Sequence, residues 1–183
     1  MKITPLALPE VLLIEPDVFG DERGYFLETW NRRRYREAGL EIEFVQDNLS
    51  FSRKGVLRGL HFQFPHPQGK LVQVLKGRVF DVAVDLRLGS PTFGKWVGVE
   101  LSEENHYQLY IPEGFAHGFY VLEEALLAYK CTDLYHPECD KTLLWNDPEI
   151  AIPWPLSGQP ILSPKDQKGR LLRQFQEGEL PKF

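Results

Sequence analysis

Two runs of β-branched and aromatic residues, at positions 56–63 and 70–84, constrain the fold of this chain more than any other feature. A polar turn at 65–69, which contains two prolines and a glycine, separates the two runs. β-branched and aromatic residues favour extended structure, whereas proline and glycine favour turns. The pattern predicts two or three consecutive strands of one sheet.

A histidine and two cations, His61, Arg58 and Lys70, are interleaved with these apolar residues. Side chains of a strand point alternately to opposite faces, so we expect His61 on one face and Arg58 on the other. The alternation groups Arg58 with Leu60 and Phe62, and His61 with Leu57, Gly59 and Gln63. Lys70 is expected to rejoin the His61 face from the neighbouring strand. That face is either a chemical site or an ordinary strand surface with a structural histidine.

The rest of the chain alternates short apolar segments with turns rich in glycine, proline, asparagine and aspartate. One helix is expected at 32–38, with Asn31 as its N-cap and Gly39 at its end. An irregular arm is expected to cross the barrel near the C-terminus. Further strands are expected at 11–14, 44–51, 78–86, 93–101, 107–111 and 126–135. We therefore predict an all-β antiparallel sandwich or jelly roll in one domain, 1–183.

Composition and charge narrow the classes of function. The chain has 183 residues and a net charge of −5, which disfavours a general surface for nucleic acid or acidic membranes. No segment reaches transmembrane length, the N-terminus does not resemble a signal peptide, and Cys131 and Cys139 form no CxxC motif. We expect a cytoplasmic protein without a disulfide framework. If the ligand is an anion, the cations that hold it must be concentrated locally.

Two spacings suggest a metal site whose ligands have been replaced. Residues 55–77 follow the pattern G-x5-H-x-Q-x6-K-x6-G, and residues 112–117 follow P-x-G-x-x-H. These resemble the two motifs of the cupins, a jelly-roll superfamily whose metal-binding members carry histidine and glutamate where this chain has Gln63 and Lys70. Only His61 and His117 match the remaining ligands. An ammonium group offers no lone pair, so we expect a metal-free pocket in which Lys70 and Arg58 supply positive charge.

The whole chain resembles the dTDP-4-dehydrorhamnose 3,5-epimerase family of cupins. The resemblance is carried, in the family's order, by residues 19–24, 44–48, 56–63, 68–72, 80–85, 90–94, 111–119, 129–130, 144–147 and 162–166. It implies a cupin-type jelly roll with one short N-terminal helix and an irregular C-terminal arm. It also implies an isomerase that inverts C3 and C5 of a dTDP-linked 4-keto-6-deoxyhexose, without a cofactor, on the way to dTDP-L-rhamnose.

Catalytic roles follow from the same resemblance. His61 matches the family's base, Asp166 its orienting partner, and Tyr129 the proton donor. Lys70 matches the group near O4 of the sugar. Asp81, which alternates with apolar residues of its strand, remains a second candidate partner for His61.

The resemblance implies substrate contacts over a wider set of positions. Arg58 and His117 match the diphosphate and sugar region, and Phe19 and Tyr135 are candidates for stacking on thymine. Asp140 and Lys165 match less closely, because residues 139–141 depart from the family pattern. The positions that match nucleotide contacts are Arg23, Glu28, Gln46 and Asn48. A homodimer is also implied, with residues 19–29 of one subunit reaching into the nucleotide site of the other.

Several alternatives remain open from the sequence. A dTDP-keto-sugar 5-epimerase, 3-epimerase or ketoisomerase would share the same base and acid. A non-catalytic sugar-binding jelly roll would not need His61 and Tyr129 in one pocket. A metal-dependent cupin oxygenase is disfavoured by Gln63 and Lys70.

Overall fold

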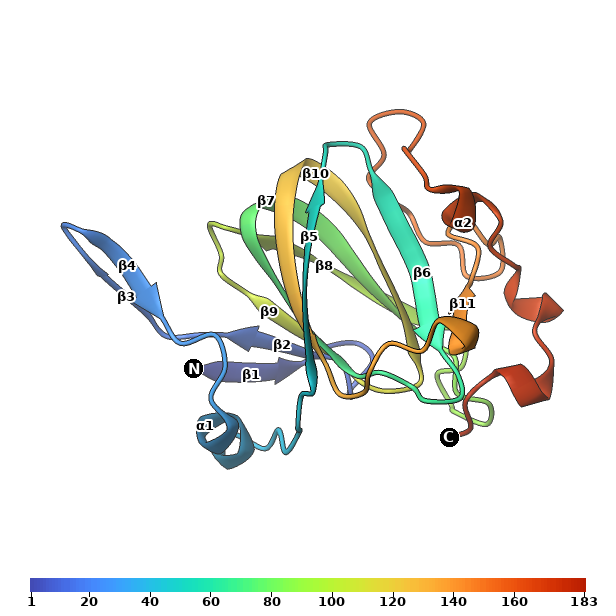
Figure 1. Ribbon diagram of the computed structural model, residues 1–183, viewed down its shortest axis with the longest axis horizontal. Helices are drawn as coiled ribbons and strands as arrows, with labels where there is room; N and C mark the ends of the chain where they lie inside the picture. The colour runs from blue at the N-terminus through green and yellow to red at the C-terminus, as the bar shows by residue number, and fades with distance from the viewer.

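Antiparallel strands build almost the entire fold. The computed structural model describes residues 1–183, and its nine-stranded sheet has the order β1-β2-β9-β7-β10-β6-β11, with β5 paired to β10 and β8 to β7. The sheet curls into the predicted jelly roll (Figure 1). Its strands are β1 (Lys2–Pro5), β2 (Leu12–Glu15), β5 (Gln46–Ser52), β6 (Leu57–Gln63), β7 (Lys70–Asp85), β8 (Trp96–Ser102), β9 (Gln108–Ile111), β10 (Phe115–Cys131) and β11 (Asp140–Thr142).

The long strands β7 and β10 form the centre of the sheet. They pair with one another along almost their whole length, and the register shifts between Val121 and Leu127. β10 also pairs with β6 through its first half and with β5 through its second half. The sequence pattern predicted only the later part of β10 as a strand. A strand that bends through an irregular register loses strict alternation, so its first half was not recognised.

Two large apolar clusters lie on the two faces of this sheet. One is inside the roll and includes Val79, Ala83 and Leu109. The other joins Val82 and Val84 to side chains from the C-terminal arm, which lies against β6 and β11 (Figure 1). The arm residues in this second cluster are Leu143, Ile150, Trp154, Leu172, Phe175 and Leu180. The predicted arm is thus confirmed as a cover that buries the outer face, each large side chain contributing roughly 1.5–3 kcal/mol.

The arm contains short helical segments that the sequence pattern did not predict. They are the α-helix α2 (Pro164–Gln167) and the 3₁₀ turns η2 (Leu172–Gln174) and η3 (Glu177–Glu179). A further 3₁₀ turn, η1 (Pro137–Cys139), precedes β11. The signal for α2 was present, because Ser163 is a favoured N-cap residue and proline is favoured at the first helical position. Ser163 does cap α2. Neither α-helix is long and apolar enough to cross a membrane.

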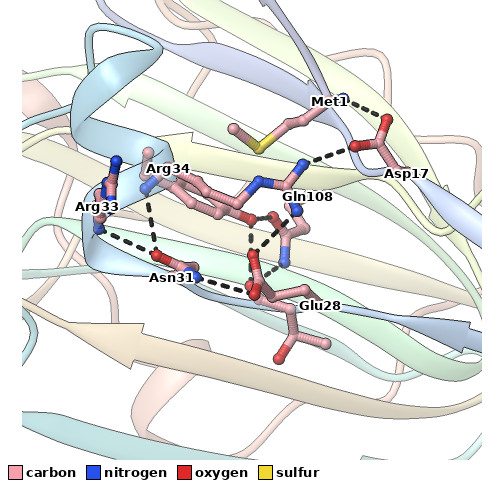
Figure 2. Close-up of polar contacts among 9 residues, drawn as sticks. Met1, Asp17, Glu28, Asn31, Arg33, Arg34 and Gln108 are labelled. Atoms are coloured by element: carbon pink, nitrogen blue, oxygen red, sulfur yellow. Dashed lines mark hydrogen bonds and ion pairs between the residues drawn. The ribbon is translucent and has the colours of Figure 1, made fainter.

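The predicted N-terminal helix is present as α1 (Arg32–Glu37), and Asn31 caps it by accepting hydrogen bonds from Arg33 N and Arg34 N. Arg34 of this helix forms ion pairs with two residues of the preceding segment (Figure 2). Its Nη2 lies 2.7 Å from Asp17 Oδ2, and its Nη1 lies 3.1 Å from Glu28 Oε1. Asp17 and Glu28 flank a separate hairpin, β3 (Val18–Asp21) and β4 (Gly24–Leu27). The ion pairs therefore anchor both ends of this hairpin.

The β3–β4 hairpin projects away from the body of the molecule (Figure 1). The charged turn between its strands was predicted as a hairpin tip, and it is one. Its aromatic side chains are nevertheless exposed: Phe19 at 61%, Tyr25 at 58% and Phe26 at 69%. An isolated two-stranded hairpin with exposed aromatic residues is marginal in water, so the β3–β4 hairpin presents an unusually apolar surface.

The expected alternation along β6 is wrong. Between the pairs His117–His61 and Phe119–Arg58, β10 has only Gly118, whereas β6 has both Gly59 and Leu60. The extra residue is a β-bulge, which reverses the facing of every residue beyond it. Arg58 therefore lines the same cavity as His61, while Leu57, Leu60 and Phe62 all enter the outer core.

We predict that Gly59→Ala destabilises the protein more than Gly55→Ala. Both glycines have positive φ, +119° and +83°, but only at Gly59 would a new Cβ meet backbone atoms, at 2.6 Å from Gly118 Cα. Gly55→Ala should cost about 1–2 kcal/mol from backbone strain, and Gly59→Ala about 1–3 kcal/mol more from overpacking. Urea unfolding measures both. Equal losses of unfolding free energy in the two variants would show that the close approach of β6 and β10 does not add to the cost of Gly59→Ala.

Candidate active site

Two adjoining cavities open where β5, β6, β7 and β10 meet the C-terminal arm. They measure about 330 Å³ and about 150 Å³. His61, Lys70 and Tyr129 line both of them. The larger cavity also contains Gln46, Asn48, Tyr135, Asp140 and Lys165, and the smaller one Arg58 and His117. Most of the predicted site residues, which are scattered over 120 positions of sequence, thus converge here.

A buried carboxylate holds the His61 ring. Asp166, which is 2% exposed, comes from the first turn of α2, and its Oδ1 lies 2.6 Å from His61 Nε2. The same oxygen accepts from Gly59 N at 3.3 Å, and Ser163 Oγ donates to Oδ2 at 2.7 Å. An ionised carboxylate only accepts, so Nε2 must donate, and Nδ1 of a neutral ring remains an acceptor.

The two candidate partners of His61 are separated in the structure. Asp81 is fully buried, and its two oxygens lie 2.9 and 3.0 Å from His117 Nε2. It therefore orients His117, whereas Asp166 orients His61. The sequence suggested Asp81 because its alternation predicted a carboxylate on the sheet, but it could not show which imidazole that carboxylate meets.

Burial keeps His61 in the form that can take a proton. Desolvation lowers the pKa of His61 below its ordinary value, and the charges of Lys165 and Lys70 act in the same direction. The contact with Asp166 raises the pKa but does not outweigh burial. Burial would raise the pKa of Asp166, but hydrogen bonds from His61 and Ser163 hold it below the usual range. A neutral imidazole beside an ionised carboxylate is therefore the state at neutral pH.

Tyr129 and Lys70 supply a proton donor and a cation to the same space. Burial raises the pKa of the Tyr129 phenol, so the group keeps its proton at neutral pH. Lys70 is 8% exposed and forms no ion pair, and burial lowers the pKa of its ammonium group despite the opposing influence of Cys131, Asp140 and Asp81. A poorly solvated cation without a partner gains from any anionic group that enters the pocket.

Polar side chains line the mouth of the larger cavity. Gln46 Nε2 donates to Asn48 Oδ1 at 3.0 Å, and Gln46 Oε1 accepts from Tyr135 N at 2.9 Å. Tyr135 Oη donates to Asp140 Oδ2 at 3.1 Å, and Lys165 forms an ion pair with the same carboxylate. Although residues 139–141 depart from the family's sequence pattern, Asp140 therefore still lies at the cavity wall.

Arg58 occupies the smaller cavity, where its Nε donates to Ser52 Oγ at 2.9 Å and its Nη2 to Phe51 O at 3.2 Å. These two hydrogen bonds use part of the guanidinium and fix its position. Arg58, Lys70 and Lys165 concentrate positive charge in a chain whose net charge is −5. The local concentration suits a ligand with several negative charges.

Three predicted substrate-binding residues do not reach this pocket within one chain. Phe19 and Arg23 belong to the β3–β4 hairpin, and Arg23 pairs there with Asp21. Glu28 is held by Arg34 and Asn31 beside α1 (Figure 2). Neither cavity includes any of the three among its lining residues.

The ligand set of the pocket does not fit a metal ion. Gln63 is buried, its Oε1 accepts from His136 N at 2.8 Å, and its Nε2 donates to Leu134 O at 3.0 Å and to His66 O. Its only ligand atom is thereby occupied. A charged Lys70 has no lone pair to offer. Gln63 instead links two loops through hydrogen bonds to their backbones. The sequence motif did not reveal this role.

Comparison with known proteins places the chain in a defined group. The family model described as dTDP-4-dehydrorhamnose 3,5-epimerase matches residues 5–174. A Pseudomonas aeruginosa protein with the same description is 58% identical over 93% of this chain and 95% of its own length. The crystal structure of a dTDP-6-deoxy-D-glucose-3,5-epimerase from Legionella pneumophila, in complex with dTDP-4-keto-L-rhamnose, is 56% identical. It superposes with a TM-score of 0.97, covering 100% of this chain and 98% of the other.

A relative with a narrower description also matches. The dTDP-4-dehydrorhamnose 3-epimerase of Streptomyces niveus is 42% identical over 100% of this chain and 90% of its own length.

Proposed function

Because the chain belongs to the dTDP-4-dehydrorhamnose 3,5-epimerase family, we propose that it converts dTDP-4-dehydro-6-deoxy-D-glucose into dTDP-4-dehydro-L-rhamnose. The observation that carries this assignment is the convergence of His61, Tyr129 and Lys70 on one cavity. The product is the precursor from which a reductase would make dTDP-L-rhamnose.

The substrate determines which groups the pocket must supply. The hydrogens on C3 and C5 flank the C4 ketone, so removal of either one leaves an enolate with its charge on O4. A base must take the proton, a cation must stabilise the oxygen, and an acid must return a proton to the opposite face. None of these steps needs a redox cofactor or a metal.

His61 is the base in this mechanism. Its neutral Nδ1 takes the proton from carbon, and Asp166 stabilises the imidazolium that forms while it fixes the ring through Nε2. Ser163 and Gly59 N keep the carboxylate in place. The imidazolium then releases its proton to solvent, and the same base serves the second carbon.

Tyr129 is the acid. Its phenol donates a proton to the enolate carbon from the face opposite His61, and the phenolate recovers a proton from solvent. A raised pKa keeps the donor protonated before each turnover. Lys70 faces O4, where its charge is most useful after the enolate has formed, and Arg58 and His117 hold the sugar and diphosphate.

Single-carbon epimerases are the nearest alternative, since the Streptomyces niveus relative is described as a 3-epimerase. They share the base and the acid, and differ in the pocket details that determine which carbon is presented to the base. A sugar-binding protein without activity would have no reason to orient a buried imidazole with a buried carboxylate.

We predict that incubation with the keto sugar in D₂O places deuterium at both C3 and C5, located by NMR. His61→Asn should abolish exchange at both carbons, because one base serves each in turn. Tyr129→Phe should retain some exchange while losing most inverted product. His106→Asn and Tyr107→Phe, outside the cavities, are the matched controls.

The outcomes separate the alternatives. Deuterium at only one carbon would identify a single-carbon epimerase, and none at either would refute the proposed function. Exchange at C5 by His61→Asn at the wild-type rate would mean that His61 is not the base.

For Lys70→Met we predict a fall in kcat of roughly a hundred- to a thousandfold with little change in KM. An interaction that strengthens as the enolate forms belongs to the transition state. Methionine keeps the apolar stem, and Lys76→Met on the same strand, where Lys76 is exposed, controls for loss of a lysine. Arg58→Met should instead raise KM. A near-normal kcat for Lys70→Met would remove Lys70 from the mechanism.

A homodimer would complete the nucleotide site. The exposed β3–β4 hairpin carries Phe19 and Arg23, and Glu28 follows it, yet none of them reaches the pocket of its own chain. Beside that pocket, a further cavity of about 410 Å³ shares Asn48 and Tyr129 with it and is lined by Leu49 and Leu75. We propose that the partner's hairpin enters there and brings these residues to the nucleotide held by Gln46 and Asn48.

Sedimentation at micromolar concentration should give twice the chain mass of 21.2 kDa. Phe26→Glu should weaken the dimer and raise KM, because it places a charge on the apolar hairpin. Phe183→Glu is the matched control, since Phe183 is 68% exposed and Phe26 69%. A wild-type monomer with full activity would mean that one chain supplies every nucleotide contact.

A further inference from the structure

Outside the catalytic pocket, His66, Asp133 and His136 bring two imidazoles and a carboxylate together, with all candidate ligand atoms within 4.8 Å of one another. None of the three takes part in the reaction described above. We propose that this cluster binds one divalent late first-row transition ion, of which Zn²⁺ is the representative.

The spacing of the donor atoms suits such an ion. His66 Nδ1 lies 3.6 Å from Asp133 Oδ2, and the rings of His66 and His136 are 4.4 Å apart and nearly parallel, at 18°. Zinc binds nitrogen and oxygen at about 2.0–2.2 Å in a tetrahedron, so its ligands lie roughly 3.4 Å apart. The lone pairs of stacked rings lie in nearly parallel planes, so one imidazole must rotate before both can coordinate the same ion. His66 is 54% exposed and the other two side chains are partly exposed, which leaves room for that rotation and a position for water.

Hydrogen bonds hold the two loops of the cluster together. Gln63 binds the backbone at His66, Leu134 and His136 through one buried amide. Gln68 Nε2 donates to Asp133 O at 2.8 Å. Gly69 and Thr132 exchange two further hydrogen bonds. The backbone that carries the ligands is therefore fixed before an ion arrives, which lowers the entropic cost of binding.

The backbone conformation of His66 and the further contacts of Asp133 and His136 also suit an ion-binding role. The backbone of His66 has φ +66°, a left-handed conformation that is unfavourable for a residue other than glycine. Asp133 Oδ1 accepts from Leu134 N at 2.8 Å, which leaves Oδ2 to face His66. Glu138 Oε1 lies 3.4 Å from His136 Nδ1, where it can orient the ring so that Nε2 coordinates.

The ligand types select the class of ion. Imidazole suits Zn²⁺, Ni²⁺ and Cu²⁺, whereas Mg²⁺ and Ca²⁺ prefer shells of oxygen. The ion would lie at the wall of the substrate pocket, because Tyr135, between Asp133 and His136, lines that pocket. Metal found in the purified protein would then belong to this loop pair and not to the reacting atoms.

Isothermal titration of the chelator-treated protein with Zn²⁺ tests the site without any measurement of turnover. We expect one ion per chain, and His66→Asn or His136→Asn should weaken binding by at least about tenfold. His106→Asn should leave it unchanged, and Mg²⁺ should not compete. Circular dichroism would verify that the variants are folded.

Two results would overturn the proposal. One is the absence of Zn²⁺ binding to the wild-type protein at 100-fold excess over chain. The other is a folded His66→Asn/His136→Asn double variant that binds Zn²⁺ as tightly as the wild type. Retention of epimerase activity after chelation is expected in every case, so failure of the metal site would leave the proposed function untouched.

Discussion

The contact between Asp166 and His61 is the interaction on which the site depends. It joins residues 105 positions apart, and it seats the C-terminal arm against the strand that carries the imidazole. A carboxylate that is 2% exposed is tolerated only if its oxygens are satisfied, and His61, Gly59 N and Ser163 satisfy them. The bulge at Gly59 presents that backbone N–H and also turns Arg58 into the cavity. Fold and site therefore share the same few residues.

Charge in the pocket is arranged around the product of the first proton transfer. Burial favours the neutral form of His61 and the protonated form of Tyr129, and the proposed mechanism takes the unpaired Lys70, whose pKa burial lowers, as a cation. In the proposed mechanism these three states are the ones needed before an enolate forms. Desolvation raises the free energy of the Lys70 charge, and the O4 anion of the enolate would lower it.

Period-two patterning and turn residues predicted the jelly roll and most strand positions, and the capping residues Asn31 and Gly39 predicted α1, because each of these follows from local sequence. It failed at β6, where one extra residue at Gly59–Leu60 reverses the alternation, since a bulge is a property of two paired strands. It also could not choose between Asp81 and Asp166, because long-range contacts leave no periodic signal. The resemblance to the family chose Asp166, and the structure agrees. Periodicity gave no function for Phe19, Arg23 and Glu28. The resemblance implies that they reach a partner's nucleotide site, and one chain does not bring them to its own pocket.

The protonation state of His61 tests this account most directly. ¹⁵N NMR of histidine-labelled protein, with the His61→Asn spectrum as the assignment, reports which ring nitrogen carries hydrogen. We expect a neutral ring at pH 7, with the proton on Nε2 toward Asp166 and Nδ1 bare. We also expect a pKa below that of free histidine, so that the ring becomes charged, and loses its function as a base, only at more acidic pH. An imidazolium at pH 7, or a proton on Nδ1, would contradict the assignment of His61 as the base.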